Sequence, residues 1–122
     1  MAEPLKTKIA SVMEDPSVMQ IARVYAKSFL GAAVSTIGVE AALEEGQSFV
    51  DDVLQRNPDL ERLLVSPTIN RGDKLKLIER VVTGRGSEFI TSFLKVLARH
   101  DRLDLLPNIL QAIFGFILTN WQ

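Results

Sequence analysis

Apolar residues recur at intervals of three and four along nearly the whole chain, and this spacing is the strongest constraint on the fold. The interval matches one face of an α-helix. In the first such stretch the spaced residues are Ala22, Ala26, Phe29, Leu30, Ala33 and Ile37. No run alternates polar and apolar side chains, as a half-buried β-strand would require. The sequence therefore predicts an all-α protein with no sheet.

Proline, glycine and capping residues divide the periodic pattern into six predicted helices. An Asp-Pro pair at 15–16 and an Asn-Pro pair at 57–58 each combine a capping residue with a proline that the first helical turn tolerates. Asn70 and Ser87 are candidate N-caps, and Gly84 suits a left-handed residue that closes a helix. The expected helices cover residues 16–37, 39–56, 58–66, 71–83, 88–100 and 101–117. The short connections predict a six-helix bundle with mostly antiparallel neighbours.

The length and composition indicate one globular domain. The chain has 122 residues, of which 47% are hydrophobic and 24% charged, so it can bury a sizeable core. We expect residues 18–120 to form this domain and residues 1–17 to form a weakly helical tail. The predicted core residues, contributed by all the long helices, are Phe29, Leu30, Phe49, Leu54, Ile78, Leu94 and Leu97.

Charge and hydrophobicity exclude several classes of partner. The formal net charge is −1, so the chain lacks the excess of Lys and Arg that binding to nucleic acid requires. The longest apolar run, from Ile109 to Leu118 with Gln111 inside it, is about half of the ~20 residues that a membrane span needs. The chain has no cysteine, which excludes disulfides and thiolate metal sites. We therefore expect no nucleic-acid partner and no direct membrane insertion.

The few candidates for catalysis or metal binding each have a structural interpretation. His100, the only histidine, is interpreted as a helix-end residue whose ring interacts with terminal carbonyls, rather than as a catalytic base. The acidic pairs at 44–45 and 51–52 point about 100° apart on a helix, which predicts solvated faces rather than converging carboxylates. The RGD tripeptide at 71–73 resembles an adhesion motif, but Asp73 follows Asn70 by three residues, where a carboxylate supports a helix N-terminus. We expect no catalytic residue, metal or cofactor.

Two of the predicted helices carry more apolar surface than one buried face requires. The first helix and the fifth helix each have a ridge of apolar residues that faces the predicted core, and each has a second such ridge beside it. Such a surplus is also typical of helices buried on all sides in a bundle. The second ridges mix small side chains with aromatic ones, which favours a groove that a foreign amphipathic helix can enter. The residues predicted to line this groove are Ile21, Tyr25, Ser28, Ala32, Phe89, Ser92, Phe93 and Val96.

Three blocks of sequence resemble a known family. They are "IARVYAKSF" from Ile21, "LLVSPTINRGDKLKLIERV" from Leu63 and "FLKVLARHDRLDLLPNILQAIF" from Phe93. The third block is the most specific, through Leu97, Ala98, Arg102, Leu103, Leu106, Pro107, Ile109 and Phe114. Over residues 21–116 the chain resembles the N-terminal domain of the delta subunit of F-type ATP synthase, which is called OSCP in mitochondria.

The resemblance implies a bundle at the top of the peripheral stalk that binds the N-terminal helix of an alpha subunit. That helix would lie between the first and fifth helices, with Tyr25 and Ser28 on one wall and Ser92 and Val96 on the other. The remaining four groove residues come from helical spacing alone. The implied role is that of a non-catalytic stator, which links the catalytic head to the membrane sector during proton-driven ATP synthesis.

The resemblance also implies a location and further partners. A peripheral position is expected on the cytoplasmic face of a bacterial inner membrane, or on the matrix or stroma side in an organelle. Contacts to b-type stalk subunits would use a C-terminal domain that we expect to be absent, because the chain stops at Trp121-Gln122. The isolated domain is expected to be a monomer. The alternatives are a helical regulatory or RNA-binding bundle of the NusB-like kind, and an enzyme.

Overall fold

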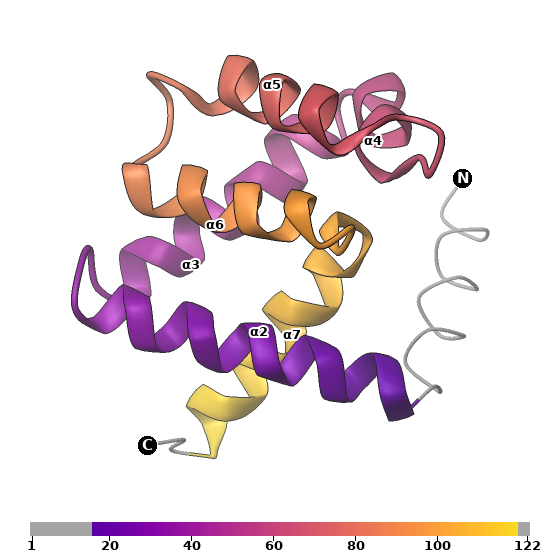
Figure 1. The fold of residues 1–122 in the computed structure, drawn as a ribbon. Helices are drawn as coiled ribbons and strands as arrows, with labels where there is room; N and C mark the ends of the chain where they lie inside the picture. Colours follow the sequence, from indigo (N-terminus) through magenta and orange to yellow (C-terminus); the bar gives the residue numbers. More distant parts are fainter. Residues whose placement is uncertain (1–15, 120–122) are drawn as a thin grey trace.

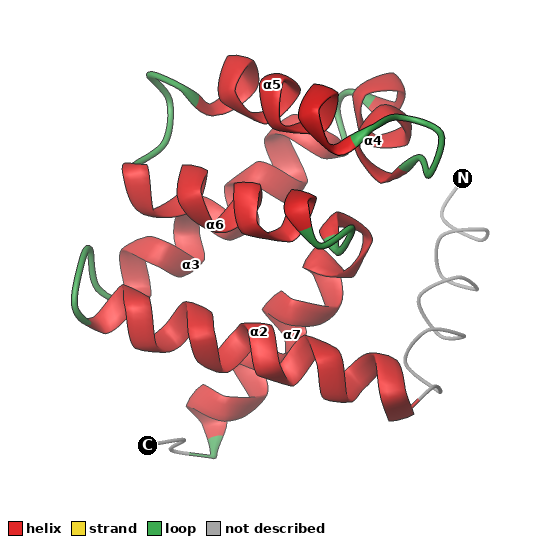
Figure 2. Ribbon diagram, in the orientation of Figure 1, coloured by secondary structure: helices red, strands yellow, loops and turns green. Residues whose placement is uncertain are grey.

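The structure is a computed structural model that describes residues 16–119. Within this range the chain forms helices and loops and no strand (Figure 2), so the all-α prediction is confirmed. In chain order the elements are α2 (Pro16–Val34), α3 (Val39–Ser48), a π-helix η1 (Phe49–Leu54), α4 (Pro58–Val65), α5 (Arg71–Val82), α6 (Glu88–Arg99), a 3-10 helix η2 (Leu103–Leu105) and α7 (Leu106–Leu118). The tail expected over residues 1–17 lies outside the described residues, apart from Pro16 and Ser17, with which α2 begins.

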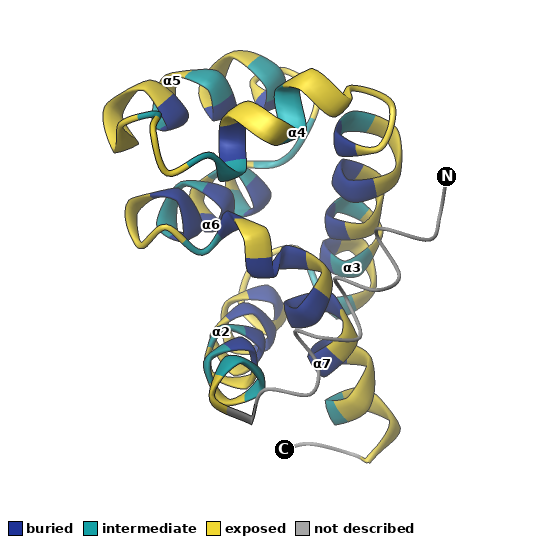
Figure 3. Ribbon diagram, turned by 90° about the vertical axis from the view of Figure 1, so that its right-hand side faces the viewer, coloured by how far each residue is buried: buried dark blue, intermediate teal, exposed yellow. Residues whose placement is uncertain are grey.

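The helices form two groups that pack face to face. In Figure 1, α5, α6 and α2 lie one below another, and α3 and α7 cross behind them. Figure 3 shows the same separation from the side, with α2 seen almost end-on beneath α6. Helix α2 packs mainly on α7, and α6 packs mainly on α5. Helices α2 and α6 are neighbours in this first group and run in opposite directions.

The predicted caps of α5 and α6 are present. The Asn70 Oδ1 accepts a hydrogen bond of 2.8 Å from the backbone N–H of Asp73, and the Asn70 amide donates one of 3.1 Å to the Asp73 carboxylate. The Ser87 Oγ accepts a bond of 3.2 Å from the backbone N–H of Ile90. These bonds satisfy N–H groups that have no partner inside their helices. Gly84 follows α5 with a φ of +82°, as predicted for its closing residue.

Helix α2 ends at Val34, three residues earlier than predicted. The Thr36 hydroxyl donates a hydrogen bond of 2.7 Å to the Ala32 carbonyl, and the Gly38 N–H donates one of 2.7 Å to the Ala33 carbonyl. These donors satisfy carbonyls at the helix end, so the chain can turn away there. Ile37 was predicted to lie on the core ridge of this helix. It is instead 36% exposed, because it lies in the turn.

Two irregular stretches replace predicted regular helix. The second predicted helix continues as the π-helix η1 rather than as an α-helix. The sixth predicted helix does not begin at Asp101, because that residue has a φ of +55° and reverses the chain. The backbone N–H of Arg102 donates a bond of 2.7 Å to the Leu97 carbonyl, which closes α6, and α7 begins only at Leu106, with Pro107 in its first turn.

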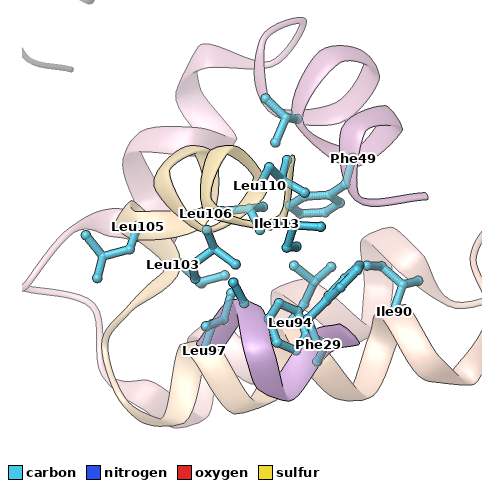
Figure 4. Close-up of a cluster of buried hydrophobic side chains, with 14 of the residues drawn as sticks. Phe29, Phe49, Ile90, Leu94, Leu97, Leu103, Leu105, Leu106, Leu110 and Ile113 are labelled. Carbon is cyan, nitrogen blue, oxygen red and sulfur yellow. The ribbon is translucent and has the colours of Figure 1, made fainter. Parts of the chain in front are cut away.

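One hydrophobic core joins both groups of helices. Figure 4 shows part of it, with side chains from α2, α6 and α7 converging. All seven predicted core residues are buried, so this prediction is confirmed. The largest side chains with less than 2% exposure are Phe29, Leu30, Leu64, Ile78, Ile90, Leu94, Leu97, Leu106, Ile109 and Ile113. Because α2 and α6 bury these ridges inward, their other faces remain available at the surface.

Candidate functional site

A groove of about 690 Å³ lies between α2 and α6 on the surface of the bundle. It follows the two antiparallel helices that lie next to each other in Figure 1. Its lining residues are Tyr25, Ser28, Ala32, Thr36, Ile37, Ser87, Glu88, Phe89, Ser92, Phe93 and Val96. The lining on α6, from Ser87 to Val96, spans roughly 13 Å at 1.5 Å per residue. This length accommodates a few turns of another helix.

The floor of the groove is aromatic. The Phe29 ring of α2 lies with its centroid 5.1 Å from the Phe89 ring and 5.0 Å from the Phe93 ring, both on α6, in edge-to-face geometry. The Phe89 and Phe93 rings are nearly parallel, with centroids 6.5 Å apart. Phe29 and Phe93 are buried, whereas Phe89 is only half-buried. The cluster joins the two walls and leaves part of an aromatic ring open to the groove.

The walls combine small side chains with two larger ones. Ser28, Ala32 and Ser92 are exposed, and Tyr25 and Val96 are half-buried. Small side chains let another backbone approach closely, while a half-buried aromatic residue offers a large apolar surface. This lining is chemically suited to the apolar face of an amphipathic helix.

The two ends of the groove carry different side chains. Exposed Glu88 lies at the start of α6. At the other end His100 is the residue that follows α6, and its ring centroid lies 6.4 Å from that of Tyr25. The backbone N–H of His100 donates to the Val96 carbonyl at 3.2 Å. His100 therefore lies at a helix end, as predicted, and its ring lies beside an aromatic residue of the groove.

The structure brings seven of the eight predicted groove residues to one site. These are Tyr25, Ser28, Ala32, Phe89, Ser92, Phe93 and Val96. Phe93 belongs to the floor rather than a wall, since it is 8% exposed and packs in the core. Ile21 lies outside the lining; it is half-buried and packs against the core. It precedes Tyr25 by one turn, so the spacing that placed it on the same ridge does not show where the groove ends.

Sequence reasoning missed four lining residues: Thr36, Ile37, Ser87 and Glu88. Thr36 continues the interval of four from Ser28 and Ala32, a signal that was available. Ile37 reaches the groove only because α2 ends early. Ser87 was predicted as a cap alone, yet this position also places it at the mouth of the groove.

The acidic pairs do not converge. Asp51 accepts a hydrogen bond from Gln47 at 3.1 Å, and Asp52 accepts one from Ser48 at 2.8 Å. In the part of the chain that the structure describes, no group of three or more His, Cys, Asp or Glu side chains is placed to hold a metal ion. The prediction of solvated faces is wrong for Glu45, which is half-buried and bonds to Ser87 of the groove.

A second hollow, of about 530 Å³, lies where α5 begins and α6 ends. The Asp101 Oδ2 accepts hydrogen bonds from Arg71 Nε at 3.1 Å and Nη2 at 2.8 Å, and the Nζ of buried Lys74 lies 3.7 Å from Asp101 Oδ1. Hydrogen bonding to Arg71 lowers the pKa of the Asp101 carboxyl below its usual value, although partial burial opposes the shift. These charges pair with one another, so they hold the turn after α6 against α5.

The fold and the groove define an all-α helical domain with a mostly apolar groove on its surface. The chain belongs to the ATP synthase delta (OSCP) subunit family, whose family model matches residues 21–117. The resemblance of the sequence to this family is therefore confirmed. None of the helices in the described range is long and apolar enough to cross a membrane.

Curated relatives carry the same description. The ATP synthase subunit delta of Chlorobium chlorochromatii is 33% identical over 93 residues, which cover 76% of this chain and 51% of the relative. That of Fuscovulum blasticum is 34% identical over 106 residues, covering 85% and 56%. That of Rhizobium meliloti is 36% identical over 96 residues, covering 75% and 49%. The chain thus spans about half the length of the curated relatives it matches. No solved structure matches it significantly.

Proposed function

We propose that this chain is part of the peripheral stalk of an F-type ATP synthase and binds the N-terminal helix of an alpha subunit in the groove between α2 and α6. The single observation that carries the proposal is the groove itself, with an aromatic floor and small residues along its walls. Membership of the delta (OSCP) family supplies the complex in which such a surface is used.

In this proposal the domain performs no chemistry. Its work is mechanical, since it holds the catalytic head to the stalk so that the rotor turns relative to the head. An attachment of this kind needs a surface that excludes water and fixes orientation. The aromatic cluster supports that role, because a partner side chain entering the groove contacts Phe89 and Phe93, whose rings are already packed against Phe29 of α2. The domain is then peripheral to the membrane.

Val96→Glu tests the proposal. Val96 is half-buried on the α6 wall, so a bound helix would remove its side chain from water, whereas the free domain leaves it in partial contact with solvent. We expect the charge to weaken binding by about 2 kcal/mol or more, roughly thirtyfold, while the free energy of unfolding barely changes. The measurement is isothermal titration calorimetry with a peptide covering the alpha-subunit N-terminus of the same organism.

Val34→Glu is the matched control. Val34 is 63% exposed at the end of α2 and does not line the groove, so the same substitution there should leave affinity unchanged. The proposal fails if the unsubstituted domain does not bind the peptide, or if both variants bind it equally well. If Val96→Glu instead unfolds the domain, the second ridge of α6 is part of the core.

A further inference from the structure

We propose that Glu45 of α3 is a positioning residue for the groove: it caps α6 from outside that helix and so sets the place of the α6 wall. The inference rests on the proposed function, because it assigns Glu45 to the same partner-helix site. Glu45 does not itself line the groove. It acts through Ser87, which does, across 42 residues of sequence.

Both oxygens of the Glu45 carboxylate engage Ser87. Oε1 accepts the Ser87 hydroxyl hydrogen at 2.6 Å, and Oε2 accepts the Ser87 backbone N–H at 3.1 Å. Hydrogen bonds to an ionised carboxylate are shorter and stronger than neutral ones. Because the Ser87 hydroxyl donates its hydrogen to Glu45, the lone pairs of the Ser87 oxygen are free to accept the hydrogen bond from the Ile90 N–H at 3.2 Å. Glu45 thus fixes the orientation of the cap that starts α6.

The carboxylate also compensates the positive end of the α6 dipole. The first turn of a helix has N–H groups without internal partners, and a negative charge near them is stabilising. Glu45 supplies that charge from α3. The same contact therefore stabilises the N-terminus of α6 and holds α6 against α3. Glu88 of α6 is acidic too, but it is exposed and lines the groove.

The first turn of α6 carries the residues that shape one end of the groove. Ser87 and Glu88 lie at its mouth, and Phe89 follows with its ring 5.1 Å from Phe29 of α2. The loop before this turn contains Gly84, whose φ of +82° other residues rarely adopt, and Gly86, where an added Cβ would lie 2.7 Å from the Ile90 side chain. Both glycines suit the path that this loop takes, and the bonds to Glu45 hold the last residue of the loop, Ser87, against α3.

Glu44 provides a matched control. It is the same residue type on the same helix, adjacent in sequence but exposed. Glu45→Gln keeps the shape of the side chain and removes its charge, so one of the two bonds to Ser87 is lost and the other weakened. Glu44→Gln makes the same chemical change at a position that does not contact α6 in this way.

The first measurement is amide hydrogen exchange and ring-to-ring nuclear Overhauser effects in the free domain, both by NMR. In Glu45→Gln we expect the amides of Ile90 and Thr91, which both bond to Ser87, to exchange roughly tenfold faster and the Phe29–Phe89 contacts to weaken, whereas Glu44→Gln leaves both unchanged. Unaltered exchange and unaltered ring contacts in Glu45→Gln would overturn the proposal. This result does not depend on any partner.

The second measurement is the affinity for the alpha N-terminal peptide, well below the melting temperature, where every variant is folded. A merely structural role would lower the melting temperature and leave this affinity unchanged. We expect Glu45→Gln and Ser87→Ala each to lose about fivefold to tenfold in affinity, and the double variant to lose less than the product of the two, because they share the bond between the Glu45 carboxylate and the Ser87 hydroxyl. Additive losses, or normal affinity in Glu45→Gln, would refute the positioning role. Absence of binding by the unsubstituted domain refutes only the proposed function, and the hydrogen-exchange result then decides the inference.

Discussion

At the scale of single residues, small side chains determine the depth of the groove. Ser28 and Ala32 on α2 face Ser92 on α6, and all three are exposed although their neighbours pack in the core. Larger side chains at these positions would meet over the aromatic floor and close the hollow. The groove therefore depends on the small volume of these side chains, and a larger side chain at one of these positions is the most direct way to block it.

Ala32→Leu should block the groove without harming the fold. Ala32 is exposed on a helix, and leucine forms helices nearly as well as alanine, so the free energy of unfolding should change by less than about 0.5 kcal/mol. The added side chain occupies the hollow, and calorimetry with the alpha N-terminal peptide should show a loss of roughly tenfold or more in affinity. Ala41→Leu, at an exposed position of α3 outside the lining, is the control. Undiminished affinity in Ala32→Leu would mean that the peptide does not occupy this part of the groove.

At the scale of elements, two helix caps that depend on local chemistry were predicted correctly, whereas the turn at Asp101, which depends on tertiary contacts, was not. The caps at Asn70 and Ser87 depend on side chains within three residues of the helix start, so the sequence contains all of their chemistry. Asp101 is different. Its left-handed backbone goes with ion pairs to Arg71 and Lys74, thirty and twenty-seven residues earlier (101 − 71 and 101 − 74), and no local pattern shows those partners. No local pattern in the sequence indicates the π-helix η1 either.

The position of the groove could be predicted from the sequence, but the places where the groove begins and ends could not. Surplus apolar residues at helical spacing appear in the sequence, and they located both walls. The groove's end near Ile21 and its mouth at Ser87 depend on how α2 and α6 cross and on where α2 stops. Glu45 was misread because its partner belongs to another helix. Spacing along one helix identifies a face, whereas contact between helices decides which part of that face is used.

The Asp101 contacts predict how stability depends on pH. Bonding to Arg71 lowers the pKa of Asp101 in the folded protein, so the folded state holds the ionised carboxylate more strongly than the unfolded state does. The resulting stabilisation is complete above the ordinary aspartate pKa, about 3.9, and is lost as the pH falls through the lowered pKa. Asp101→Asn removes the charge while asparagine still tolerates a positive φ.

We therefore expect Asp101→Asn to lower the melting temperature at pH 7 and to differ less from the unsubstituted domain at pH 3. Thermal unfolding followed by circular dichroism at both pH values measures this. Asp104→Asn, at an exposed neighbour, is the control and should show little difference at either pH. An equal penalty at pH 7 and pH 3 would show that the Asp101 charge does not stabilise the turn after α6.

At the scale of the whole molecule, the core and the groove lie on different, adjoining faces of the same two helices, with Phe93 where the two faces of α6 meet. Leu94 and Leu97 of α6 are fully buried among α2 and α7, while Ser92 and Val96 of the same helix face the groove. The core joins both groups of helices, so the domain should unfold as one cooperative unit. Binding at the groove and packing in the core should then respond to different substitutions, although they share the same helices.

This separation can be tested by combining core and groove variants with the alpha N-terminal peptide. A peptide that binds only the folded domain, present at a hundred times its dissociation constant, raises the free energy of unfolding by about 2.7 kcal/mol, a shift of roughly 10 °C in melting temperature. Leu94→Ala should lose roughly 2 to 5 kcal/mol of stability by leaving a cavity, yet retain the peptide-induced shift. Val96→Glu should show the reverse, with nearly normal stability and no shift.

If Leu94→Ala is too unstable to measure, Ile113→Val removes a single buried methylene from α7 at a cost of about 1 kcal/mol and should retain the shift in the same way. A core variant that stays folded but shows no shift would demonstrate that the groove cannot form without the full core, and the two surfaces would then be one energetic unit.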